Sequence, residues 1–298
     1  MYNFEISRYV ILFKMTNDLV TVVIPSYNHD KYILECINSV LNQTYENIEL
    51  IIIDDGSIDK TRELLSKLES QNKKNIKIIF KDNEGLINTL NGSYELINGK
   101  YVAFLASDDI WLPNKIEEQI NIISRYSNVG FIFSDSFFLC RDQKTDVLYS
   151  SYKKKLNKIE PNEPIEIYKF LLRNNFIATP TVLIRTSCLK QVGFFDKELG
   201  IEDYDMWLRL SKNNKTVYIN KPLSYYRLHN KNFSKQIRPM LLGTLRTLDK
   251  HLNIDLTRPL RKTLDKFLFL LCALFYKIKK YHIIKHMKMN FKKRENQK

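Results

Sequence analysis

The chain has 298 residues, of which 44% are hydrophobic. This length and composition allow one large domain with an appendage, and they exclude a chain that is disordered throughout. The formal net charge is +14, so bulk charge alone favours polyanionic partners, either nucleic acid or anionic lipid.

Residues 1–18 are predicted to form a short leader ahead of the first strand. Their apolar run, Tyr9–Phe13, is too short to span a bilayer and has no small-residue cleavage site, so a secreted product is not expected. Met15 is an alternative start. The cysteines form no CxxC motif and suit buried apolar positions in a reducing compartment, which favours the cytoplasm. They are Cys36, Cys140, Cys188 and Cys272.

The first part of the chain alternates β-branched runs with amphipathic stretches. Leu19–Ile24 and Ile48–Ile53 are near-continuous apolar runs, typical of strands buried on both faces. Strands that alternate with helices at these lengths predict an α/β fold with a mostly parallel central sheet. The other predicted strands are 76–80 and 101–105, and the predicted helices begin at Asp30 and cover 59–69 and 86–97.

Polar clusters follow three of these strands at their carboxyl ends, at Pro25–Asn28, Asp54–Ser57 and Ser107–Asp109. In open parallel sheets the ligand site lies beyond the carboxyl ends of the strands. We therefore expect residues from distant parts of the chain to meet at one rim of the sheet.

The pattern is less regular after residue 130. Gly130–Phe133 and Thr181–Ile184 predict strands, whereas the polar, lysine-rich stretch Thr145–Pro164 predicts a loop or small insertion. A helix is expected over about Tyr204–Lys212, followed by a strand near Lys215–Ile219.

Residues 236–298 are expected to form a helical region that associates with a membrane. The apolar run Phe267–Tyr276 is shorter than the ~20 residues that a spanning helix needs, so an interfacial helix or a docking hairpin is predicted. Basic residues dominate from Arg258 onwards, which predicts contact with an anionic membrane surface.

The acidic pairs have both structural and chemical interpretations. Asp108 and Asp109 follow a buried strand, where they would cap a helix or bind Mg²⁺ or Mn²⁺. Asp55 would belong to a capped turn, or its carboxylate would accept the N–H of a uracil ring that stacks on Tyr27. The negative charges of the pair Glu202–Asp203 would interact favourably with the dipole of the helix that follows, or the pair would supply a general base.

Two residues near the end of this region are ambiguous when taken alone. His229 is a lone histidine, which is more often structural than a metal ligand. Arg227 is equally compatible with a surface charge.

Taken together, these motifs resemble glycosyltransferase family 2, whose members have the GT-A fold. The resemblance runs from about Val20 to Ser234, so residues 19–235 are expected to form a GT-A domain. The matching elements are Val23–Asn28, Ser39–Thr44, Ile53–Ser57 with Thr61, Asn83–Gly85 with Asn91, Phe104–Trp111 with Pro113, Gly193–Asp196, Glu202–Asp203 and Tyr226–His229.

The resemblance also implies roles for individual residues. Asp203 would be the catalytic base, with Glu202 beside it, and Asp109 would coordinate Mn²⁺ or Mg²⁺ together with His229. Asp108 would bind the ribose or assist the metal. The remaining residues implied to contact the nucleotide sugar are Pro25, Tyr27, Asp55, Lys81, Asn83 and Gly85.

This sequence departs from the family's pattern at one position. The family's acidic triplet often begins two places before Asp108, where this chain has Ala106. Fewer carboxylates are then available for the metal, which gives His229 more weight.

The implied reaction is a single displacement with inversion at the anomeric carbon. The expected donor is a UDP-hexose carrying glucose or galactose, and the expected acceptor is a lipid-diphosphate-linked sugar such as an N-acetylhexosamine, as in bacterial O-antigen or capsule synthesis. The expected location is the cytoplasmic face of the plasma membrane, with no nucleic acid as partner.

Other classes are weaker on the sequence. One alternative that stays open is a glycosyltransferase that uses another donor or another acceptor, such as a protein or another glycan. A nucleic-acid-binding protein would have basic residues interleaved with exposed aromatics, whereas here they gather at the C-terminus. A nucleotidyltransferase would need a glycine-rich phosphate loop where Pro25–Asn28 stands, and Asp109 and Asp203 argue against an inactive, non-catalytic relative.

Overall fold

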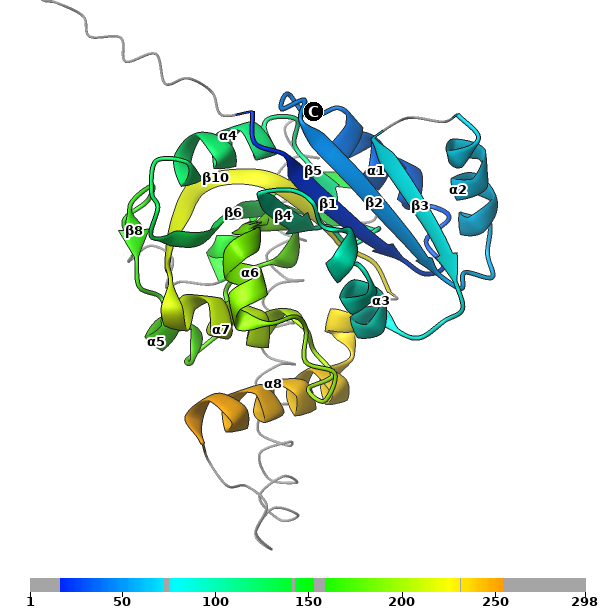
Figure 1. The fold of residues 1–298 in the computed structure, drawn as a ribbon. Helices are drawn as coiled ribbons and strands as arrows, with labels where there is room; N and C mark the ends of the chain where they lie inside the picture. The colour runs from blue at the N-terminus through cyan, green and yellow to red at the C-terminus, as the bar shows by residue number, and fades with distance from the viewer. Residues whose placement is uncertain (1–16, 72–74, 141–142, 153–158, 231, 254–298) are drawn as a thin grey trace, which may run out of the picture.

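The computed structural model describes residues 17–71, 75–140, 143–152, 159–230 and 232–253. Within these residues one sheet forms the centre of the molecule, with strand order β3-β2-β1-β4-β9-β6-β10-β5 (Figure 1). Two short strands extend it, because β7 pairs with β6 and β8 pairs with β10. The strands are β1 Val20–Ser26, β2 Ile48–Asp55, β3 Ile76–Lys81, β4 Tyr101–Phe104, β5 Ile110–Trp111, β6 Val129–Cys140, β7 Gln143–Leu148, β8 Pro164–Ile165, β9 Val182–Arg185 and β10 Lys215–Leu228.

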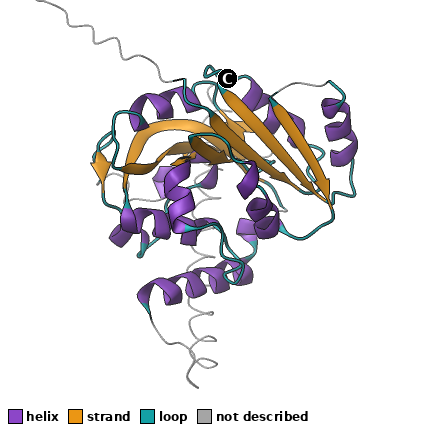
Figure 2. Cartoon of the chain, viewed as in Figure 1, coloured by secondary structure: helices purple, strands orange, loops and turns teal. Residues whose placement is uncertain are grey.

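Helices cover both faces of the sheet, giving three layers (Figure 2). The α-helices are α1 Ile33–Leu41, α2 Thr61–Glu69, α3 Leu86–Gly92, α4 Lys115–Ile123, α5 Tyr168–Leu171, α6 Thr186–Val192, α7 Asp203–Asn213 and α8 Ile237–Leu252. Short 3-10 helices occupy Tyr94–Leu96, Tyr149–Tyr152, Thr179–Thr181 and Phe233–Lys235.

The central strands bury both faces, as their continuous apolar runs predict. In β1, Val22 and Ile24 join the core beneath α1 and α4, whereas Val23 joins the core beneath α6 and α7. Alternation of side chains across a strand places neighbouring residues in different layers. An apolar run without polar interruptions therefore becomes the middle layer of the fold.

The register of the parallel strands aligns their carboxyl ends. Strand β1 pairs with β2 from Val20 opposite Ile48 to Ser26 opposite Asp54, and it pairs with β4 on its other side. Strands β3, β2, β1 and β4 all run parallel. The polar segments that follow β1, β2 and β4 therefore lie at one edge, as predicted.

The second half of the sheet is mixed, and the predicted boundaries there were wrong in two places. Strand β6 continues to Cys140 because its polar run is buried and hydrogen-bonded; for example, Ser136 Oγ donates to Ser224 O at 3.0 Å. The predicted loop from Thr145 begins instead within β7, where Thr145 Oγ1 donates to Phe138 O of β6 at 2.5 Å. A third difference lies in the first half of the chain, where the predicted helix 86–97 is divided into α3 and the 3-10 helix Tyr94–Leu96.

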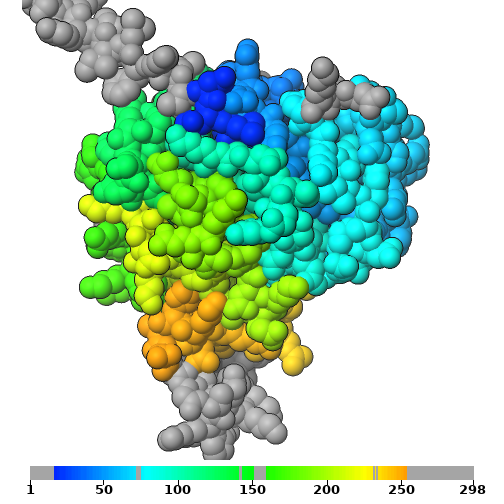
Figure 3. Space-filling view, in the orientation of Figure 1, coloured from blue at the N-terminus to red at the C-terminus, as the bar shows by residue number. Residues whose placement is uncertain are grey.

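Helix α8 packs against the domain rather than extending from it. It lies at the lower end of the molecule, where its surface is continuous with the neighbouring elements (Figure 3). His251 Nε2 lies 2.9 Å from Asp205 Oδ1 on α7, and Lys250 Nζ lies 3.0 Å from the same oxygen. The predicted apolar run Phe267–Tyr276 lies outside the described residues. Within those residues, no helix has the length and apolar character required to cross a bilayer.

Candidate active site

One cavity of about 970 Å³ opens at the carboxyl edge of the parallel strands. Segments following β1, β2 and β4 line it, together with the start of α7 and the end of β10. All but one of the residues expected to act on a nucleotide sugar are among its walls. These are Pro25, Tyr27, Asp55, Asn83, Gly85, Asp108, Asp109, Glu202, Asp203 and His229.

Lys81 is the expected residue that does not line the cavity. Its Nζ lies 2.8 Å from Asp55 Oδ1, so it acts on the cavity through its ion pair with the lining residue Asp55. The backbone N–H groups of Glu84 and Gly85 each donate to the Asp55 carboxylate at 2.9 Å. Burial tends to raise the pKa of Asp55, but the hydrogen bonds from Glu84 and Lys81 outweigh it and lower that pKa. Asp55 is thus held ionised at the cavity edge.

The turn after β2 brings two loops together. Gly56 has φ +74°, and a Cβ there would lie 2.7 Å from Asn83 N, so only glycine allows this approach. Asn28, after β1, donates its backbone N–H to Ser57 Oγ at 2.9 Å and accepts from Ile58 N at 2.8 Å. These contacts fix the loop that carries Tyr27, whose side chain is 44% exposed and therefore open to a stacking ligand.

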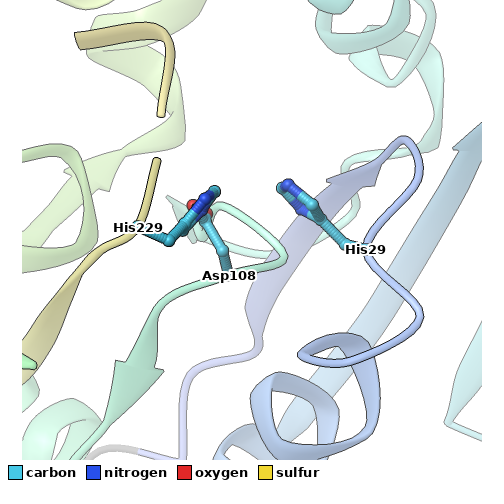
Figure 4. A group of neighbouring side chains, drawn as sticks. All are labelled: His29, Asp108 and His229. Carbon is cyan, nitrogen blue, oxygen red and sulfur yellow. The ribbon is translucent and has the colours of Figure 1, made fainter. Parts of the chain in front are cut away.

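A potential metal-binding group lies deeper, where three loops meet. His29 follows β1, Asp108 follows β4 and His229 follows β10, and the three side chains converge (Figure 4). One ligand atom from each lies within 4.8 Å of the other two. His229 Nε2 is 2.8 Å from Asp108 Oδ2, and His29 Nδ1 is 2.7 Å from Ser107 Oγ. Hydrogen bonding of one ring nitrogen orients the other, as in ligating histidines.

Asp109 lines the same cavity but does not belong to this group. Its Oδ1 accepts the backbone N–H of Arg227 at 2.9 Å, and its side chain is buried. Burial and the adjacent charge of Asp108 raise the pKa of Asp109 well above its usual value. Asp108 is the carboxylate grouped with both histidines, and the metal role expected for Asp109 stays a prediction.

Arg227 connects the two acidic residues. Its Nε donates to Asp108 O at 2.7 Å, and its guanidinium forms an ion pair with Glu35 and lies 4.7 Å from the ring centroid of Tyr32. With 2% exposure it is not a surface charge, which removes that alternative. One residue thus fixes both the Asp108 backbone and the Asp109 side chain.

The second acidic pair faces the cavity from the start of α7. Thr179 Oγ1 donates to Asp203 Oδ2 at 3.2 Å, which ties this carboxylate to the loop before β9. Burial and the charge of Asp203 raise the pKa of Glu202 to about 7. Near neutral pH Glu202 therefore readily holds a proton beside the Asp203 carboxyl group.

Sequence reasoning missed two groups of residues in this cavity. His29 stands directly after the polar cluster Pro25–Asn28, and its place at a strand end was the signal that could have identified it. The inner face of α8 also lines the cavity, through Met240, Thr244 and Leu248. No local pattern predicts that contact, because it depends on how α8 docks.

This fold and this cavity define a GT-A-type α/β protein with an acidic, histidine-containing site. Among solved structures, the mannosyltransferase PcManGT from Pyrobaculum calidifontis, in complex with GDP-Man and Mn²⁺, matches with a TM-score of 0.62 at 13% identity, covering 80% of this chain and 65% of that one. S. aureus TarS (residues 1–349) in complex with UDP-GlcNAc matches with a TM-score of 0.58 at 20% identity, covering 81% and 75%. Both likenesses concern the fold alone.

The sequence comparisons identify the family. The profile of "Glycosyl transferase family 2" matches residues 21–178. An uncharacterized glycosyltransferase of Rickettsia typhi is 34% identical over 71% of this chain and 64% of its own length. The Escherichia coli protein WfaP, a UDP-Glc:alpha-D-GlcNAc-diphosphoundecaprenol beta-1,3-glucosyltransferase, is 34% identical over 71% of this chain and 78% of its own length. The chain belongs to glycosyltransferase family 2.

The match to several relatives is partial. The chain spans 64% of the length of two Rickettsia relatives and about a third of the length of three others.

Proposed function

We propose that the protein is an inverting hexosyltransferase that moves glucose or galactose from a UDP-sugar to a hydroxyl of a lipid-diphosphate-linked sugar. The product would be a β-glycoside of the kind used in bacterial surface polysaccharides such as O-antigen. The observation that carries this proposal is that Asp55, Asp108 and Asp203, far apart in sequence, line one cavity. The similarity to WfaP supports the choice of donor and acceptor.

The donor base would lie at the edge formed by β1 and β2. Tyr27 offers an exposed ring for stacking, and Asp55 offers a carboxylate that accepts a uracil N–H. Pro25, Asn83 and Gly85 would complete this part of the site, with Lys81 holding Asp55 ionised.

The donor diphosphate would lie beside His29, Asp108 and His229. One carboxylate and two imidazoles form a ligand set that suits Mn²⁺ better than Mg²⁺, since Mg²⁺ prefers oxygen. When bound, the divalent cation would act as a Lewis acid that stabilises the charge of the leaving nucleoside diphosphate. Asp109 and Arg227 would hold Asp108 in place.

Asp203 would act as the general base. Its carboxylate accepts the proton of the acceptor hydroxyl, the hydroxyl oxygen bonds to the anomeric carbon, and the bond to the nucleoside diphosphate breaks on the opposite face. A single displacement inverts the anomeric configuration and needs no covalent nucleophile. Glu202, with its raised pKa, would keep the second charge beside Asp203 low near neutral pH.

The expected place of action is the inner face of the bacterial plasma membrane. The basic residues that follow α8 in the sequence would contact anionic lipid there. Deletion of the residues after Thr257 is expected to move the protein from the membrane fraction to the soluble fraction, and unchanged fractionation would contradict this part of the proposal.

The test of the reaction is a panel of nucleotide sugars incubated with Mn²⁺ or Mg²⁺ and a synthetic N-acetylglucosamine diphosphate carrying a long alkyl chain. Release of UDP that increases with acceptor is the expected result, with a new β-linkage visible by NMR. Absence of nucleoside diphosphate release from every donor would contradict the proposal.

A further inference from the structure

The cavity extends beyond the donor residues into a part with different walls. Met240, Thr244 and Leu248 line it from α8, and their spacing of four residues places them on one face of that helix. Met240 and Leu248 also pack against the core cluster that contains Ile201 and Tyr204. This wall is largely apolar, in contrast to the acidic edge formed by the parallel strands.

Arg173, an exposed residue, supplies a cation to the lining of this cavity. Arg173 is the only lysine or arginine among the described residues that line it. Within the described part of the chain, its guanidinium donates no hydrogen bond and forms no ion pair, and its only hydrogen bond joins its backbone N–H to Phe170 O at 3.2 Å. Guanidinium groups bind phosphate through bidentate hydrogen bonds, in which two N–H groups donate to two phosphate oxygens. Arg173 is therefore a ready partner for a phosphate anion.

Arg173 belongs to the segment that joins α5 to the 3-10 helix Thr179–Thr181. This segment leads to Thr179, whose hydroxyl donates to Asp203. At its other end, Leu171 O accepts the hydroxyl of Tyr204 at 2.7 Å, and Tyr168 Oη lies 3.5 Å from His251 Nδ1 on α8. Contacts of this segment thus reach both Asp203 and the cavity-lining helix α8.

We propose that Arg173 and the inner face of α8 form the acceptor subsite, which takes an amphiphilic phosphosugar. The acceptor hydroxyl would meet Asp203, its phosphate would meet Arg173, and the apolar chain attached to that phosphate would lie along Met240 and Leu248. This inference rests on the proposed function. The donor diphosphate is assigned to a separate group of lining residues, Asp108, His29 and His229.

The charge is tested with Arg173→Gln, Arg173→Lys and the control Lys169→Gln, which removes an exposed cation from α5 outside the cavity. The acceptors are N-acetylglucosamine diphosphate with a long alkyl chain and the phosphate-free alkyl N-acetylglucosaminide. Arg173→Gln is expected to raise KM for the diphosphate acceptor about tenfold, and not for the phosphate-free one. Arg173→Lys should raise KM for the diphosphate acceptor less than Arg173→Gln does, and Lys169→Gln should have the KM of wild type.

The apolar wall is tested with Met240→Gln against Leu242→Gln, an exposed position on the same helix. Met240→Gln is expected to raise KM for the long-chain acceptor several-fold but not KM for a short-chain analogue. Leu242→Gln should leave both unchanged.

The outcomes separate this inference from the proposed function. An increase in donor KM with Arg173→Gln, or equal effects on both acceptors, would overturn the subsite while leaving the transferase standing. Donor hydrolysis by wild type without use of the diphosphate acceptor would overturn both the subsite and the acceptor named in the proposed function, and would leave only the use of a nucleotide sugar. No turnover of any donor would contradict the proposed function itself.

Discussion

His229 Nε2 lies 2.8 Å from Asp108 Oδ2, although 121 positions separate the two residues in the chain. Strand β10 brings the histidine to this point, and the end of β4 brings the aspartate. His29, from the end of β1, completes the group. The sheet thus gathers three potential ligands that no local sequence motif contains.

Loss of either central ligand is expected to weaken metal binding. Asp108→Asn and His229→Gln should each raise the Kd for Mn²⁺ at least about tenfold, because each removes a donor atom from the group. Titration followed by the electron paramagnetic resonance of free Mn²⁺ measures this without a turnover assay. The control Glu63→Gln removes an exposed carboxylate on α2 and should bind like wild type. Wild-type affinity in both variants would remove the metal site from this position.

Gly56→Ala is expected to destabilise the fold by about 1–3 kcal/mol and to weaken UDP binding, since φ +74° disfavours alanine and its Cβ would meet Asn83 N. The displaced loop would withdraw the backbone donors that hold Asp55. Urea unfolding and calorimetry with UDP measure the two effects. Gly92→Ala is the matched control, because a Cβ there has no neighbour within 4 Å. Equal behaviour of the two variants would refute this role for Gly56.

Glu202→Gln is expected to stabilise the protein at high pH. The pKa of Glu202 rises from an ordinary value of 4.5 to about 7 in the folded state. A carboxyl group whose pKa is raised in the folded state contributes stability that is fully present below its pKa in the unfolded state. That stability is lost as pH rises through its pKa in the folded state. The variant lacks this loss, so its Tm relative to wild type should increase between pH 5 and pH 8. A difference that stays constant over this range would show that Glu202 does not titrate as described.

Asp205→Asn is expected to loosen α8. This aspartate lies on α7, two positions after Asp203, and contacts Arg209 at 2.7 Å as well as His251 and Lys250. Removing its charge takes one carboxylate from these contacts, while Lys250 keeps Asp196 and Arg209 keeps backbone carbonyl acceptors, so the loss should cost about 1–3 kcal/mol. Limited proteolysis should then cut α8 faster than in wild type, whereas the exposed Glu166→Gln should behave normally. Unchanged protection of α8 would count against this anchoring.

The first four strands were predictable because their runs are apolar on both faces. Long-range polar packing was harder to infer. Ser136 and Asp135 interrupt the apolar pattern of β6, yet they are buried and hydrogen-bonded, so the predicted strand was too short. No sequence pattern around Arg227 predicted that it would be buried and would donate hydrogen bonds to Asp108 and Asp109.

Some motif residues proved structural when their partners came into view. Gln43, within the Ser39–Thr44 motif, donates to Leu112 O at 2.8 Å and accepts from Ile116 N at 3.0 Å. Asn91 exchanges two hydrogen bonds with the backbone of Phe195. Sequence order alone predicts that such residues matter, whereas only their contacts show that they join segments of the fold.

The role of Asp203 as general base is tested most directly by measuring sugar transfer and UDP binding on one preparation of Asp203→Asn. We expect kcat to fall by at least about a hundredfold, since the general base is lost, while the Kd for UDP with Mn²⁺ stays within about twofold of wild type. Transfer at the wild-type rate by Asp203→Asn, or a wild-type protein that binds no UDP in the presence of Mn²⁺, would contradict this expectation.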